Sequence, residues 1–144
     1  MKTLLTRRAV LALLASLAWA PGAALAQDPH AVIVQKVARD WLVLADNLDA
    51  DATWKAAGVR FQKAITAANW ADSLKKARGA RGTVIQRAVA GSTFASTFPG
   101  LPAGGTYALV RFRTSFSNPP SGSEDVTLEI GPDSTWRVIG YTIH

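Results

Sequence analysis

The spacing of apolar residues changes near Gly82, and this change constrains the fold more than any other feature of the chain. Before Gly82, apolar residues recur every three or four positions, as in helices that bury one face. After it, apolar and polar residues alternate, as in half-buried strands. The order predicts an α+β fold in which three N-terminal helices pack on one face of a curved, four-stranded antiparallel sheet.

Three helical segments are expected, over residues 28–47, 51–65 and 67–78. Asp51 is the expected N-cap of the second helix, and Gly58 lies within it at a cost of about 1 kcal/mol in helix propensity. The apolar faces are expected to comprise Val34, Val37, Trp41, Leu44, Leu48, Trp54, Ala57, Gly58, Phe61, Ile65, Trp70, Leu74 and Ala77.

Four strands are expected, over residues 82–90, 106–116, 124–130 and 135–143, with a long connection over 92–105. Strict alternation assigns the inner and outer faces of each strand. The inner face is predicted to hold Val110, Phe112, Phe116, Val126, Leu128 and Ile130.

The last strand is apolar on both alternating faces, which a sheet covered on one side does not favour. A bulge at Gly140 would add one residue and reverse the alternation. Trp136, Val138, Tyr141 and Ile143 would then all face the helices. The outward side chains would be Arg111, Arg113, Glu129 and Arg137, with Glu129 as the cross-strand partner of Arg137.

Residues 1–26 have the pattern of a secretory signal peptide: basic residues, then an apolar run too short to span a membrane, then small residues ending at Ala26. Cleavage there would leave a periplasmic domain over 27–144. An uncleaved membrane-proximal anchor is the alternative. The Arg7–Arg8 pair leaves both the general secretory route and the twin-arginine route open.

The amino-acid composition argues against several kinds of functional site. The chain has no cysteine, and its two histidines, His30 and His144, lie far apart near the ends of the mature segment. A thiol nucleophile is therefore absent, and we expect no histidine-based triad, no metal and no cofactor. Three of the sixteen basic residues lie in the leader, which leaves thirteen against ten acidic residues, a net charge of about +3. This charge does not favour a nucleic-acid partner.

Three aspartates, Asp46, Asp49 and Asp51, lie close enough in sequence to suggest calcium binding. The glycine and the distal glutamate of an EF-hand loop are missing, so acidic helix capping is expected instead.

Two groups of residues are candidates for binding. One would line a ligand cavity, although aromatic residues at such spacing also form ordinary cores. It comprises Trp41, Trp54, Tyr107, Phe112 and Tyr141. The other is a surface basic patch that could contact an acidic partner or an anionic membrane, or only compensate a helix C-terminus. It comprises Lys75, Lys76, Arg78 and Arg81.

Four stretches, over residues 39–54, 69–87, 98–116 and 133–143, together resemble the bacterial family called domain of unknown function 4019. "GPDST" departs from its pattern, where an Asp-Gly turn is more usual. The resemblance implies an exported single domain with a cone-shaped fold similar to the nuclear transport factor 2-like or cystatin-like classes. It implies no activity.

A non-catalytic periplasmic module that binds a partner protein or a small apolar ligand is the expected function. The alternative is a small cavity enzyme of the isomerase or dehydratase type, which would use a tyrosine and an aspartate. Asp40 is the nearest acid, but its helical position is expected to be exposed, and no inward-facing carboxylate is evident. A structural role at the envelope is a third hypothesis.

Overall fold

The computed structural model describes residues 28–118 and 121–144, so the expected signal peptide lies outside the described residues. In chain order, the elements of the described residues are α1 (Pro29–Asp46), α2 (Ala50–Ala56), α3 (Val59–Ala64), α4 (Ala67–Gly79), β1 (Val84–Ala95), β2 (Tyr107–Phe116), β3 (Gly122–Ile130) and β4 (Trp136–Ile143). The strands form one antiparallel sheet in the order β1-β2-β3-β4. The expected α+β class is thus confirmed.

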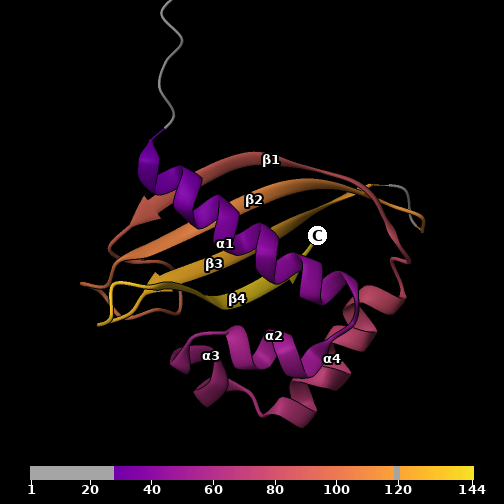
Figure 1. Ribbon diagram of the computed structural model, residues 1–144, viewed down its shortest axis with the longest axis horizontal. Coiled ribbons are helices and arrows are strands. Elements are labelled where there is room, and N and C mark those ends of the chain that lie inside the picture. Colours follow the sequence, from indigo (N-terminus) through magenta and orange to yellow (C-terminus); the bar gives the residue numbers. More distant parts are fainter. Residues whose placement is uncertain (1–27, 119–120) are drawn as a thin grey trace, which may run out of the picture.

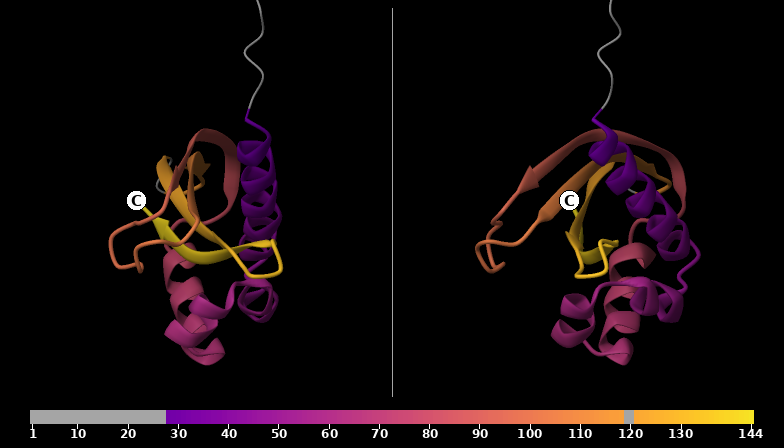
Figure 2. Two further views of the ribbon diagram at one scale, coloured as in Figure 1. Left: turned by 90° about the vertical axis from the view of Figure 1, so that its left-hand side faces the viewer. Right: turned by 60° about the vertical axis from the view of Figure 1, so that its left-hand side comes forward.

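The helices do not all cover the sheet in the same way. The long α1 crosses the inner face of the curved sheet, whereas α2, α3 and α4 gather beyond the edge formed by β4 (Figures 1 and 2). Within the described residues, no helix combines the length and apolar character needed to cross a membrane.

The expected second helix is divided in two, which corrects the sequence-based prediction. Ala57 and Gly58 are extended between α2 and α3, and the backbone N–H of Gly58 donates to the carbonyl of Val138 at 2.8 Å. A Cβ atom on Gly58 would lie 3.0 Å from Cγ2 of Ile139, so the close approach to β4 favours glycine. Asp49, not Asp51, caps α2 by accepting from the N–H of Ala52 at 3.0 Å.

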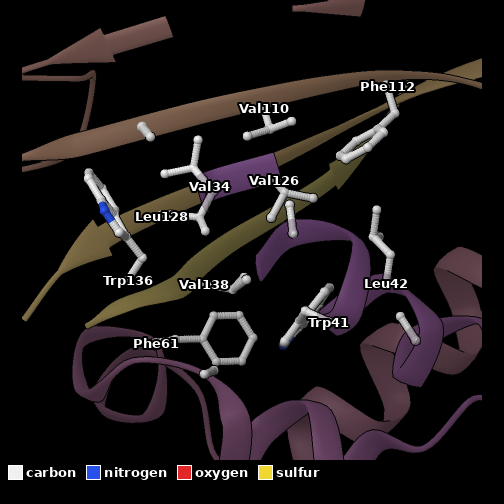
Figure 3. Close-up of a cluster of buried hydrophobic side chains, with 14 of the residues drawn as sticks. Val34, Trp41, Leu42, Phe61, Val110, Phe112, Val126, Leu128, Trp136 and Val138 are labelled. Carbon is white, nitrogen blue, oxygen red and sulfur yellow. The ribbon is translucent and has the colours of Figure 1, made fainter. Parts of the chain in front are cut away.

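The core lies between α1, the inner face of the sheet and the helices beyond β4 (Figure 3). Trp41, Trp70 and Phe112 are buried as expected, and Trp54 packs against the core while partly buried. The predicted burial is wrong at two positions: Leu48, which follows the end of α1, and Ala77 on α4 are exposed. The buried apolar residues of the sheet include Ala108, Val110, Phe112, Phe116, Val126, Leu128, Trp136 and Val138.

The first strand is longer than expected. It continues to Ala95, because Ser92 to Ala95 pair with β2 rather than beginning the loop. Much of β1 is exposed at the open edge of the sheet, so buried and exposed side chains alternate only weakly along this strand.

The bulge in β4 is confirmed. Thr127 pairs with Gly140 and Leu128 pairs with Val138, so Ile139 is the extra residue. The reversal brings Tyr141 to the inner face, where its ring lies 5.3 Å from that of Trp41. Arg137 points outward as expected, but it pairs with Asp133 at 2.7 Å. Glu129, its expected partner, instead pairs with Arg60 of α3 at 2.8 Å.

Candidate functional site

Four charged side chains meet on the inner side of the sheet: Asp46 from α1, Arg78 from α4, Arg87 from β1 and Glu124 from β3. We call these four residues the ionic cluster. The side chain of Glu124 is 0% exposed and that of Arg78 is 3% exposed. Asp46 is 27% exposed, at a surface hollow of about 470 Å³ that Arg78 also lines.

The ionic cluster is closely paired. Asp46 accepts from Arg78 at 2.6 Å, and Arg87 donates to both carboxylate oxygens of Asp46 at 2.8 Å. Arg87 Nε donates to Glu124 at 2.6 Å, while Arg78 Nη1 lies 3.3 Å from the same carboxylate. Two cations and two anions thus balance each other, as burial of charge requires.

Two hydroxyl groups complete the hydrogen bonding of Glu124. Tyr141 donates to Oε1 at 2.6 Å, and Thr114 donates to Oε2 at 2.5 Å. The carboxylate therefore accepts hydrogen bonds on both oxygens from hydroxyl and guanidinium groups. Both oxygens are occupied by protein donors, so neither is free to contact a ligand.

Protonation states near the ionic cluster also oppose acid–base catalysis. Burial raises the pKa of Asp46, but hydrogen bonds from Arg87 and Arg78 outweigh burial, and the net pKa is lowered. Burial, reinforced by the charge of Glu124, raises the pKa of Tyr141 well above its ordinary value. Asp46 is thus a weak base, and Tyr141 is reluctant to release its proton.

The inward-facing carboxylate was missed in the sequence-based prediction, although the sequence contains a signal for it. Glu124 has the same parity as Val126 and Leu128, so it falls on the inner face of β3. Arg78 follows Trp70 and Leu74 at intervals of four on α4, which places it on the buried face. What the sequence does not reveal is that these elements bring opposite charges together.

The five candidate cavity residues do not line one space. Trp41, Phe112 and Tyr141 lie on the inner side within the packed core. The Trp54 indole N–H donates to the carbonyl of Ile65 at 2.9 Å, beyond β4. Tyr107 projects from the outer face, and its hydroxyl donates to the carbonyl of Pro102 at 2.9 Å.

The proposed surface basic patch is wrong for Arg78, which is buried in the ionic cluster. Lys75 and Lys76 are exposed, and the guanidinium of Arg81 lies 5.8 Å from the centre of the Phe116 ring. Arg78 extends the buried face of α4 because its charge is compensated there by the carboxylates of Asp46 and Glu124.

The three neighbouring aspartates have separate partners. Asp46 belongs to the ionic cluster, Asp49 caps α2, and Asp51 pairs with Lys55 at 2.7 Å on the surface. Capping was therefore the correct interpretation for Asp49 but not for Asp51. Asp40 is exposed as expected, and it pairs with Lys36 at 2.5 Å.

The outer face of the sheet carries two neighbouring hollows. One, of about 780 Å³, lies between the α2–α3 segment and the β3–β4 hairpin. The other, of about 240 Å³, lies beneath the segment that connects β1 to β2. Both are lined by Ile139, the extra residue of the bulge, so we treat them as one feature, the outer trough.

The outer trough changes character along its length. Its smaller hollow is lined by Phe98, Pro99, Leu101, Leu109, Thr127, Ile139 and Gly140, none of which is charged. Leu109, Thr127 and Gly140 are register partners across three strands, which gives this hollow a rigid floor. Its larger hollow adds charged side chains from both the helices and the hairpin, namely Lys55, Arg60, Glu129, Asp133 and Arg137.

The fold and the site define a small α+β domain with a meander sheet, a charge-neutral buried cluster and an open trough that is uncharged at one end and charged at the other. The chain belongs to the family described as "Protein of unknown function (DUF4019)", whose model matches residues 37–141. Comparisons with curated proteins and with solved structures found no significant match.

Proposed function

We propose that this protein is a non-catalytic binding module that acts in the periplasm, and that the outer trough is the site where it holds a small apolar ligand. The observation that carries the proposal is the row formed by Leu109, Thr127 and Gly140, which Phe98 and Leu101 overhang. An apolar, concave surface on a rigid scaffold is typical of ligand sites. The curved sheet crossed by α1 also supports a cone of the nuclear transport factor 2-like or cystatin-like kind.

A second candidate is docking of a partner protein on α1. Val32, Ile33 and Val43 are each about half exposed on the solvent side of this helix. Exposed apolar side chains grouped on one element are typical of protein contacts.

The enzyme alternative has less support. The tyrosine and acids that approach each other are Tyr141, Asp46 and Glu124, and they are held by Arg78 and Arg87 in a neutral set. A general acid or base needs a pKa near the working pH, whereas the pKa values of Asp46 and Tyr141 are shifted away from it.

Binding of the neutral fluorescent probe N-phenyl-1-naphthylamine tests the proposed ligand site. The wild-type protein should raise the probe's fluorescence saturably, and Leu109→Glu should weaken binding by about tenfold because it places a charge on the apolar floor. Val43→Glu is the matched control, because this valine is 56% exposed on α1, away from the trough. Absence of saturable binding, or equal loss in both variants, would contradict the site.

Export is tested separately by the intact mass of the protein recovered from the periplasmic fraction. Cleavage after Ala26 should give a chain that begins at Gln27. A mass that retains residues 1–26 would refute cleavage, and recovery only from the cytoplasm would refute export.

A further inference from the structure

We propose that the ligand of the outer trough is an amphipathic carboxylate, with its acid group among the charged side chains near α3 and its apolar tail beneath the β1–β2 connection. This inference rests on the proposed function and adds the chemical class of the ligand. It follows from the polarity gradient along the trough, from a charged end at Arg60 and Arg137 to an uncharged end at Phe98 and Leu101.

The charged end is lined by three cations, Lys55, Arg60 and Arg137, and two anions, Glu129 and Asp133. Asp51 pairs with Lys55 at 2.7 Å and balances the third cation. The preference for an acid therefore rests on the N–H groups of the two arginines, from which an anionic head group can accept hydrogen bonds and a cationic one cannot.

The two arginines keep hydrogen-bond donors that the protein does not use. Arg60 donates through Nε and Nη2 to Glu129, and Arg137 donates through Nη1 and Nη2 to Asp133. A guanidinium has five N–H donors, so Nη1 of Arg60 and Nε of Arg137 are without a partner among the described residues. The two side chains are 38% and 39% exposed, which leaves them accessible to a ligand.

The geometry around the arginines suits a carboxylate. Arg60 already holds the carboxylate of Glu129 in a bidentate pair through Nε and Nη2. Arg137 holds the carboxylate of Asp133 in a bidentate pair through Nη1 and Nη2. A ligand carboxylate can accept from the remaining donors, or replace one of these partly exposed acids. From the carboxylate, the apolar tail of the ligand would continue over Ile139, which lines both hollows, towards Leu109.

Displacement of N-phenyl-1-naphthylamine tests the proposal, with decanoate and decyltrimethylammonium as competitors below their micelle concentrations. The two share an apolar tail of similar length and differ in the charge of the head group. Decanoate should displace the probe at a concentration about tenfold lower than the cation does. Arg137→Gln should lower the affinity for decanoate by about tenfold, whereas the affinity for the neutral probe should be retained.

Arg113→Gln is the matched control, because Arg113 is an exposed arginine on the outer face that does not line the outer trough. It should leave decanoate binding unchanged. Equal displacement by the two competitors, or equal loss in Arg113→Gln and Arg137→Gln, would overturn the carboxylate proposal while leaving the apolar site intact. Failure of both the probe and decanoate to bind, the latter checked by calorimetry, would refute the ligand site itself.

Discussion

The charged residues of the ionic cluster stabilise one another inside this small domain. Glu124 is completely buried, and it contacts two guanidinium groups and two hydroxyl groups. Pairing in the interior compensates a desolvation cost of several kcal/mol for each ion, so the partners act as a set. Removing one member leaves the others buried with incomplete charge compensation.

Glu124→Gln should lower the free energy of unfolding by about 3–5 kcal/mol, because Arg78 and Arg87 would share only Asp46. Urea unfolding followed by far-ultraviolet circular dichroism measures this change. Glu129→Gln is the matched control, since Glu129 pairs with a partly exposed arginine, and it should shift the urea midpoint far less. Similar midpoint shifts in the two variants would contradict the stabilising role of the ionic cluster.

At the scale of elements, two local irregularities position the outer trough. The break at Gly58 brings α3 against β4, so that Arg60 reaches Glu129 on the outer face. The bulge at Ile139 leaves that side chain on the outer face while it returns Tyr141 to the inner face. The break at Gly58 therefore places α3 as one wall of the outer trough, and the bulge supplies Ile139, which lines both of its hollows.

Gly58→Val should destabilise the protein by about 1–3 kcal/mol, because a side chain there meets Ile139 at the edge of β4. Gly79→Ala is the matched control: outside its chain neighbours and the adjacent backbone of its own helix, no atom of the described residues lies within 4 Å of the added Cβ, and the residue ends α4. Its stability should stay the same or rise by up to about 1 kcal/mol. Thermal melting of both variants checks the expectation, which fails if Gly58→Val melts with the wild type.

At the scale of the whole molecule, helices and sheet share one core although α2, α3 and α4 lie beyond β4 (Figure 1). Trp70 of α4 contacts Phe61 of α3 and Trp41 of α1, with ring centres 4.9 and 5.9 Å apart. Arg78 of the same helix reaches Glu124 in the sheet. The helices beyond β4 should therefore unfold together with the sheet.

Urea unfolding should be a single transition, with coincident curves from tryptophan fluorescence and far-ultraviolet circular dichroism. Trp41, Trp54 and Trp70 report on the helices, and Trp136 reports on the sheet. Trp136→Phe restricts the fluorescence of the described residues to the helices, and its midpoint should still match the circular dichroism of the same variant. Separate midpoints would show that α2, α3 and α4 form an independent unit.

Local spacing alone determined much of this protein. The alternation of apolar residues predicted β2 and β3, and the conflict of faces around Gly140 predicted the bulge in β4. Thr66 directly precedes α4 in the sequence, and its side chain caps this helix by accepting from the N–H of Asn69 at 3.2 Å. These features depend on neighbours in sequence, so the sequence is sufficient to predict them.

Only the tertiary structure decided which distant residues meet. The sequence places Glu124 and Arg78 on buried faces, but their pairing depends on how the C-terminal end of α4 lies against the sheet. The split at Gly58 depends on a hydrogen bond to Val138, eighty positions along the chain. The outer trough likewise joins segments from α3, the β1–β2 connection and β4. Such contacts arise from packing between elements, and no local periodicity encodes them.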